Sequence, residues 1–240
     1  MTTIVRNLQL VRDRITMACV AAGRNPSSVR LLAVSKTFAA DAVLDAMDDG
    51  QRAFGENYIA EGADKILAIR AKQAAGLAVT TPGLEWHCIG PVQSNKTRLV
   101  AEHFDWVQSV DRLKTAQRLS EQRPPDLPPL QICLQVNIDG GANKSGVVPD
   151  ELEALIEEVL GLPRLNLRGL MTLPEPAPNF EAACAVHAKA KTLFDRINAS
   201  GALSWPMDTL SMGMTADLEA AIHSGSTLVR IGSAIFGSRG

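Results

Sequence analysis

Eight short apolar segments recur along the chain, and each is followed by a stretch with helical spacing or by the last residues of the chain. The segments are residues 31–35, 52–55, 85–90, 106–110, 131–137, 165–171, 209–213 and 227–232. They are apolar throughout rather than alternately polar, which is typical of parallel strands covered on both faces. Eight such units predict an α/β fold closed as a (β/α)8 TIM barrel. A doubly wound open sheet remains an alternative.

The stretches between these segments carry the spacing of helices. They are residues 40–49, 57–75, 94–102, 112–122, 149–160, 179–199 and 215–224. An extra N-terminal helix is expected before the first strand, because apolar residues recur at helical spacing from Ile4 to Ala22 and Gly23 ends the pattern. The Pro-rich segments 123–129 and 173–179 are interpreted as loops of the barrel. We therefore expect one domain over residues 1–240.

Composition argues against several kinds of partner and site. The net charge is −2 without a run of like charges, so neither nucleic acid nor an anionic membrane surface is an expected partner. The four cysteines stand far apart, without a Cys or His cluster at ligand spacing, so no metal site is expected. Neither a signal peptide nor a membrane-spanning run is present, which indicates a cytoplasmic protein.

Lys36 is the most unusual residue in this pattern, because it directly follows the apolar segment at residues 31–35. A buried ammonium group is costly unless it is paired, and desolvation lowers the pKa of a lysine amine. A neutral amine is a nucleophile toward carbonyl carbons. The position of Lys36 therefore predicts Schiff-base chemistry, either with a carbonyl substrate or with pyridoxal phosphate.

Glycines and hydroxyls gather around the last two predicted strands and indicate an anion site. Gly213 and Gly232 permit close backbone approach. Barrels often bind phosphate near their seventh and eighth strands, where a short extra helix begins, and residues 233–236 are expected to form that turn. Hydroxyls and amides are expected to hold the anion at Ser211, Ser226, Thr227 and the residues after Gly232.

Two further residues admit two interpretations each. His87 lies in a predicted strand and is either a packed histidine or a site residue. Met171 ends a predicted strand, where methionine is more often part of the core than in contact with a ligand. Both are kept as additional candidates for the site.

Taken together, several motifs of the chain resemble those of the pyridoxal-phosphate homeostasis proteins, relatives of the N-terminal barrel of alanine racemase. The resemblance extends from the first strand to the end of the chain. The motifs that carry it are AVSKT, FGENY, WHCIGPVQSNK, QVNIDGGANKSG, RGLMTLP and LSMGMTADLEAAIHSGSTLVRIGSAIFG.

The resemblance implies roles for individual residues. Lys36 would carry pyridoxal 5′-phosphate as a Schiff base, and Arg230 would face the pyridine nitrogen. A cation at that nitrogen disfavours a protonated ring and makes the cofactor a poorer electron sink. Asn57 and Met212 would lie near the ring. The phosphate would be bound by Ser211, Thr227, Gly232 and neighbouring amides.

The expected function is to hold and deliver the cofactor, with little or no turnover. Racemisation needs two opposed bases, and the resemblance implies that alanine racemase takes one of them from a β domain that this sequence lacks. The only tyrosine, Tyr58, is expected at the start of a helix. Because no β domain is present to complete a dimer, a monomer is expected. Transient contact with pyridoxal-phosphate-dependent apo-enzymes is expected as well. Two alternatives stay open: a weak amino-acid racemase that uses His87 or water as second base, and a cofactor-free Schiff-base aldolase.

Overall fold

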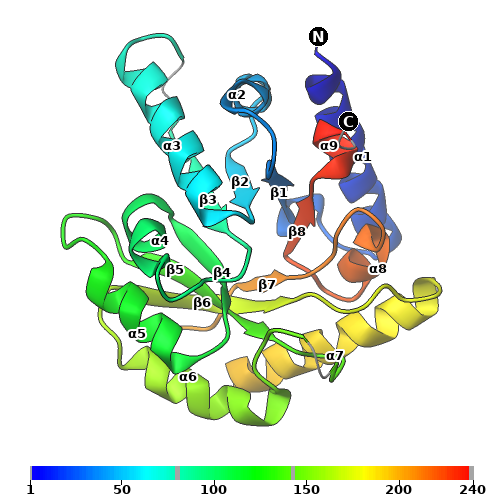
Figure 1. Ribbon diagram of the computed structural model, residues 1–240. Helices are drawn as coiled ribbons and strands as arrows, with labels where there is room; N and C mark the ends of the chain where they lie inside the picture. Colours follow the sequence, from blue (N-terminus) through cyan, green and yellow to red (C-terminus); the bar gives the residue numbers. More distant parts are fainter. Residues whose placement is uncertain (1, 79–81, 142–143, 238–240) are drawn as a thin grey trace.

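Eight parallel strands close a barrel in the order β1 to β8 in the computed structural model, which describes residues 2–78, 82–141 and 144–237 (Figure 1). The strands are β1 (Arg30–Val34), β2 (Ala53–Glu56), β3 (Glu85–Cys88), β4 (Trp106–Val110), β5 (Leu130–Val136), β6 (Leu165–Thr172), β7 (Thr209–Ser211) and β8 (Leu228–Ile231). The predicted barrel is confirmed. The open-sheet alternative is wrong, because β8 pairs with β1.

Helices surround the barrel, and the N-terminal helix precedes it as predicted. The helices are α1 (Thr3–Ala21), α2 (Ala40–Asp48), α3 (Ile59–Ala74), α4 (Thr97–His103), α5 (Leu113–Gln122), α6 (Leu152–Leu160), α7 (Phe180–Ala199), α8 (Leu218–His223) and α9 (Ser233–Phe236). Helix α1 packs against α8 and α9 (Figure 1). Arg14 pairs with Glu219 of α8 at 2.7 Å, and the Asn7 amide donates to the Ile235 carbonyl at 2.9 Å. These bonds hold the first helix against the last two.

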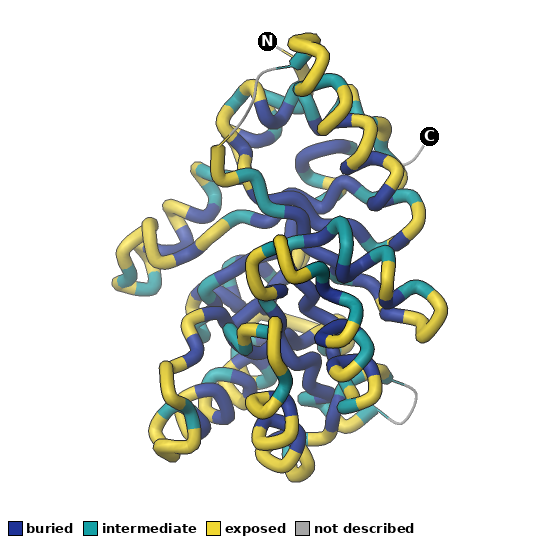
Figure 2. Tube along the Cα trace, turned by 90° about the vertical axis from the view of Figure 1, so that its left-hand side faces the viewer, coloured by how far each residue is buried: buried dark blue, intermediate teal, exposed yellow. Residues whose placement is uncertain are grey.

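Burial divides the molecule into two apolar regions. The strands and the inner sides of the helices are buried, whereas the outer helix faces are exposed (Figure 2). One large cluster fills the space between barrel and helices. Two small clusters are separate from it, and they consist of Leu32, Ala53 and Leu228, and of Trp106, Cys133 and Met171. Because side chains alternate along a strand, these two clusters belong to the barrel interior.

Closure of the barrel determines where Lys36 lies. In the ladder between β1 and β8, Leu32 pairs with Arg230 and Ala33 with Ile231. The residues that follow the two strands, Lys36 and Gly232, therefore meet at the carboxyl end of the barrel. A Cβ atom on Gly232 would lie 3.1 Å from the Val34 carbonyl oxygen, which is tighter than an ordinary contact. Glycine at this position permits the close approach of the two segments.

A buried ion pair lies beneath the turn that carries Lys36. Lys65 of α3 donates to the Glu56 carboxylate of β2 at 2.6 Å, and both side chains are almost fully buried. Lys65 also donates to the Ser35 carbonyl at 2.8 Å, and the Ser35 hydroxyl donates to Glu56 at 2.6 Å. Burial raises the pKa of the Glu56 carboxyl, and Lys65 and Ser35 oppose that rise. The residue before Lys36 is thus fixed through two of its groups.

The residue after Lys36 is fixed as well. Thr37 has a φ of 68°, a left-handed conformation that β-branched residues rarely adopt. Its N–H donates to the Glu61 carboxylate at 2.6 Å, and Glu61 also accepts from Lys65 at 3.2 Å. The backbone of Lys36 is therefore anchored on both sides, and this strained turn persists because its neighbours are bonded.

Gly169 of β6 provides a test of the barrel ladder. A Cβ atom at Gly169 would lie 1.6 Å from the Thr209 carbonyl oxygen, an overlap that only separation of β6 from β7 could relieve. We expect Gly169→Ala to lower the free energy of unfolding by about 3 kcal/mol or more in urea titrations. The matched control is Gly161→Ala, where the nearest atom is 3.6 Å away and the expected change is below about 1 kcal/mol. Equal midpoints for the two variants would contradict the register.

The buried pair of Lys65 and Glu56 provides a second test. Lys65→Met leaves a carboxylate buried without its partner, so we expect a loss of about 3–5 kcal/mol in the free energy of unfolding. Adding Glu56→Gln to that variant should restore part of the loss. The control is Lys72→Met on the same helix, because Lys72 and Asp41 form a solvent-exposed pair, for which the expected loss is below about 1 kcal/mol. Similar losses for the two lysines would rule out the described role of Lys65.

Candidate functional site

A pocket of about 510 Å³ opens at the carboxyl ends of the strands, a volume typical of sites for small molecules. Functional sites of parallel barrels lie at this end, because the loops that follow the strands converge there. The lining residues are Val34, Lys36, Thr37, Phe38, Asn57, Ile89, Met171, Leu173, Met214, Thr215, Ala216, Arg230, Gly232, Ser233 and Gly237.

Five of the residues predicted for the site line this pocket together. Lys36 and Asn57 follow β1 and β2, Met171 belongs to β6, and Arg230 and Gly232 lie at the end of β8. Lys36 is half-buried, whereas Arg230 and Met171 are buried. The predicted meeting of a lysine from the first strand with residues of the last strand is therefore present in the fold.

Two predicted phosphate ligands do not reach the pocket. Thr227 precedes β8, and its carbonyl accepts from the N–H of Arg30, the first residue of β1, at 2.9 Å. It therefore lies at the amino end of the barrel, opposite Lys36. The Ser226 hydroxyl is fully buried and donates to the Met212 carbonyl at 2.8 Å. The prediction that Ser226 and Thr227 share an anion site with Lys36 is wrong, because both residues come before their strand instead of after it.

Four other predicted residues are not part of the pocket lining. Ser211, Met212 and His87 are fully buried and do not line it. The Gly213 carbonyl accepts from the Arg230 N–H at 3.0 Å, so this glycine supports β8 from the side. Because His87 points into the barrel interior, the structure gives no support to His87 as a base at the pocket.

Sequence reasoning missed part of the wall that faces Gly232. Met214, Thr215 and Ala216 follow β7 and line the pocket. Ser233, which begins α9 and also lines it, is one of the residues after Gly232 that were expected at the anion site. A signal for the residues after β7 existed in the chain. Strand ends at the same rim should be level with one another, so the residues after the seventh strand belong beside those after the eighth.

The pocket wall carries positive charge that pairs directly with no described carboxylate, although the Asp217 carboxylate stabilises the Arg230 cation from outside the lining. Arg230 is 5% exposed, and its guanidinium donates to the Ser211 hydroxyl at 2.7 Å and to the Thr172 carbonyl at 2.9 Å. Burial lowers the pKa of Arg230 to about 10. In the described part of the chain neither Lys36 nor Arg230 forms an ion pair, and no Asp or Glu lines the pocket. Since buried charges are usually paired, this wall suits an anionic ligand.

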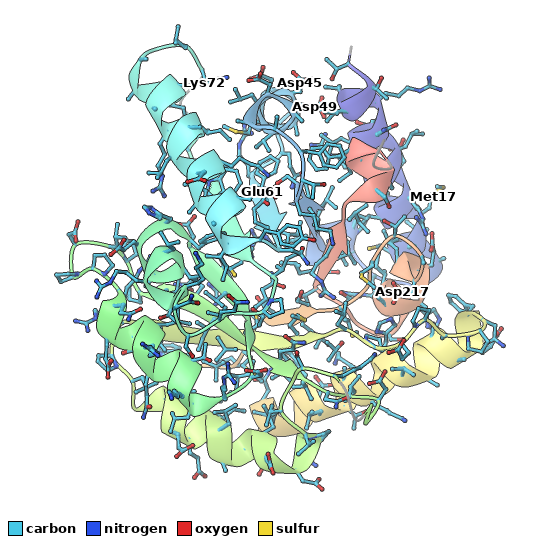
Figure 3. The ribbon with its side chains drawn as sticks, viewed as in Figure 1. Met17, Asp45, Asp49, Glu61, Lys72 and Asp217 are labelled. Carbon is cyan, nitrogen blue, oxygen red and sulfur yellow. The ribbon has the colours of Figure 1, made fainter. Side chains whose placement is uncertain are left out.

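The loop after β7 is held by an ionised aspartate. Asp217, labelled beside α8 in Figure 3, accepts from the Met214 N–H at 2.7 Å and lies 2.9 Å from the imidazole Nε2 of His187 on α7. Burial alone would raise the pKa of Asp217, but the bonds from His187 and Met214 bring it below its ordinary value. The shape of the pocket wall at Met214–Ala216 therefore depends on a negative charge outside the pocket.

The described part of the chain offers neither a cluster of metal-binding side chains nor a membrane-spanning helix. Residues 2–78, 82–141 and 144–237 contain no group of three or more His, Cys, Asp or Glu side chains that could hold a metal ion. In the same ranges no helix has the length and apolar character needed to cross a membrane.

Comparison with known proteins places the chain in a family. Residues 6–240 match the family model described as the alanine racemase N-terminal domain. The chain is 54% identical to the pyridoxal phosphate homeostasis protein of Pseudomonas aeruginosa, covering 100% of this chain and 97% of that protein. It is 50% identical to the protein of the same name from Escherichia coli, covering 100% and 98%.

A solved structure agrees with these relatives. PipY of Synechococcus elongatus, with PLP bound, is 32% identical and superposes with a TM-score of 0.80, covering 98% of this chain and 100% of PipY. The residues of the pocket thus stand on a backbone shared with that protein over nearly its whole length. The chain belongs to the pyridoxal phosphate homeostasis protein family, which is built on the barrel of the alanine racemase N-terminal domain.

Proposed function

We propose that the pocket binds pyridoxal 5′-phosphate and that the protein takes part in the homeostasis of this cofactor, holding and releasing it with little turnover of its own. The observation that carries the proposal is the pair of basic side chains, Lys36 and Arg230, in a pocket whose described lining includes no carboxylate. The names of the relatives, and the bound PLP in the PipY structure, support the same ligand.

The residues present fit the chemical groups of this cofactor. Lys36 offers a primary amine for the aldehyde, and Arg230 offers guanidinium donors for the ring nitrogen. Gly232, Thr215 and Ser233 offer amides, hydroxyls and space for the phosphate. When bound, pyridoxal phosphate supplies an aldehyde that captures amines and a ring that withdraws electrons. The basic, mostly apolar wall holds the cofactor and orients it between Lys36 and Arg230.

The composition of the wall favours a carrier over a racemase. Apart from Lys36, the described lining residues include no His, Glu, Asp, Tyr or Cys, which are the usual groups for proton transfer. His87 lies inside the barrel, and Tyr58 is half exposed and outside the lining. A second base opposite Lys36 is therefore missing from the described wall, which supports little turnover.

We propose further that the protein acts in the cytoplasm as a monomer and meets pyridoxal-phosphate-dependent apo-enzymes transiently. Leu173 and Met214 line the pocket and are 45% and 37% exposed. Two exposed apolar side chains beside the opening suit brief contacts rather than a permanent interface, which buries a larger area.

Loss of the amine at residue 36 tests the proposed ligand. Wild-type protein incubated with pyridoxal 5′-phosphate should develop a visible absorption band, and borohydride should fix the cofactor to Lys36, as peptide mass analysis would show. Lys36→Ala should lose both signals, whereas Lys189→Ala, an exposed lysine of α7, should retain them. A band that persists in Lys36→Ala would refute the attachment site. Absence of any band in the wild type would refute the proposed function and favour a cofactor-free aldolase.

The charge on Asp217 supplies a pH-dependent test. Its folded-state pKa is lowered, so its contribution to stability is present above its unfolded-state pKa of about 3.9 and is lost as the pH falls through the folded-state pKa. We expect Asp217→Asn to lose about 1–2 kcal/mol of unfolding free energy near neutral pH and much less in acid. It should also bind pyridoxal phosphate more weakly near neutral pH.

The control for this test is Asp48→Asn at the exposed end of α2, which should match the wild type in both measurements. A constant difference between Asp217→Asn and the wild type at all pH values would contradict the role of the carboxylate charge.

A further inference from the structure

A row of polar side chains crosses the barrel interior behind Arg230. The Arg230 guanidinium donates to the Ser211 hydroxyl at 2.7 Å, and that hydroxyl donates to Gln108 Oε1 at 2.6 Å. Gln108 Nε2 lies 2.9 Å from His87 Nδ1. Ser211 belongs to β7 and Gln108 to β4, so their bond passes through the interior. All three residues behind Arg230 are fully buried.

The chemistry of the groups fixes the direction of every bond in this row. A guanidinium only donates, so the Ser211 oxygen accepts from Arg230 and its own proton is free for Gln108 Oε1. The Gln108 amide nitrogen then faces His87, which makes Nδ1 an acceptor and leaves the imidazole proton on Nε2. Burial lowers the pKa of His87, which agrees with a neutral ring. With the imidazole proton on Nε2, facing the Glu85 carboxylate, this arrangement satisfies every group of the row.

The far end of the row terminates on an anion at the amino end of the barrel. His87 Nε2 lies 3.4 Å from the Glu85 carboxylate, which also pairs with Arg30. Burial alone would raise the pKa of Glu85, but His87 and Arg30 lower it to about 2. Trp106 stacks on the imidazole with centroids 5.0 Å apart and fixes the ring plane. The row thus connects a cation at the pocket with a carboxylate on the opposite side of the barrel.

The orientation of the Arg230 guanidinium depends on these hydrogen bonds, because no described carboxylate forms an ion pair with it. A long, flexible arginine side chain loses rotamer entropy when it is fixed in one orientation. Here the Ser211 hydroxyl and the Thr172 carbonyl receive two of its donors, and only the hydroxyl is itself oriented by further side chains. If the Ser211 proton turned away from Gln108, the hydroxyl would no longer be a fixed acceptor for Arg230.

We propose that Ser211, Gln108 and His87 are positioning residues, which hold the Arg230 guanidinium in the orientation that faces the cofactor's ring nitrogen. This inference rests on the proposed function, because it takes pyridoxal 5′-phosphate as the ligand of Arg230. It goes beyond that function in assigning the interior of the barrel, which does not touch the ligand, a role in controlling the protonation of the bound ring. Gln108 is the central member, because its amide sets the direction of both neighbouring bonds.

The test uses full-length protein loaded with pyridoxal 5′-phosphate that carries a heavy-nitrogen label in the ring, and nitrogen NMR reports how that atom is bonded. Arg230→Gln defines the resonance of a ring without the guanidinium. Gln108→Leu and Ser211→Ala should move the resonance at least half of the way toward that of Arg230→Gln. The matched control is Ser120→Ala, which removes an equally buried hydroxyl bonded to the Pro163 carbonyl far from the pocket, and it should keep the wild-type resonance.

A purely structural role for the row predicts a different outcome. The midpoint temperature of thermal unfolding would then fall in Gln108→Leu, Ser211→Ala and Ser120→Ala alike, while the ring-nitrogen resonance of all three stayed at the wild-type position. That result overturns the inference. Ser211→Thr keeps the hydroxyl and should restore most of the wild-type resonance that Ser211→Ala loses.

The design also separates failure of this inference from failure of the proposed function. If Arg230→Gln moves the resonance and neither Gln108→Leu nor Ser211→Ala does, only the positioning role is refuted. If Arg230→Gln leaves the resonance unchanged, Arg230 does not face the ring nitrogen and both the orientation of the cofactor and this inference fail. If the wild type does not bind the labelled cofactor, the proposed function itself fails.

Discussion

The hydrogen-bonded ladder between β1 and β8 is the contact on which the rest of the structure depends. It joins the first and the last strands of the closed sheet, so residues far apart in the sequence share one rim. Lys36 reaches the pocket from the first strand, and Arg230 and Gly232 reach it from the eighth. The missing side chain of Gly232 lets the two segments approach closely. An open sheet of the same strands would have separated these groups by the width of the whole sheet.

The protein treats its buried cations in three different ways. Lys65 is neutralised directly by Glu56. Arg123 is buried as well, but it donates to the carbonyls of Ala101, Phe104 and Pro128 and does not line the pocket. Arg230 keeps its charge beside a cavity, with a neutral hydroxyl and a carbonyl as its partners. The comparison indicates that the charge of Arg230 is available to a ligand, whereas the charged groups of Lys65 and Arg123 stabilise the fold through a carboxylate and backbone carbonyls.

The sequence is sufficient to predict the barrel and the site residues that the first and the last strands contribute. Apolar runs locate buried strands reliably, and the position of Lys36 directly after such a run identified the rim. The prediction for Ser226 and Thr227 is wrong because the motif that contains them extends across the start of β8 without any local sign of that boundary. Only the register of the strands shows whether a residue lies at the amino or the carboxyl end of the barrel. The inward direction of His87 was also undecided, since both faces of a barrel strand are apolar in composition. The bond from Ser211 to Gln108 joins positions 103 residues apart, which no local pattern reveals.

The anchored turn around Lys36 has a consequence for how a ligand enters and leaves. Ser35 is tied down through Lys65 and Glu56, and the Thr37 amide through Glu61, so the main chain of the turn has little freedom. Only the aliphatic arm of the lysine can move, by rotation about its own single bonds. Loading and unloading then require no rearrangement of the scaffold, and the speed of exchange is governed by access through the opening rather than by a slow change of shape.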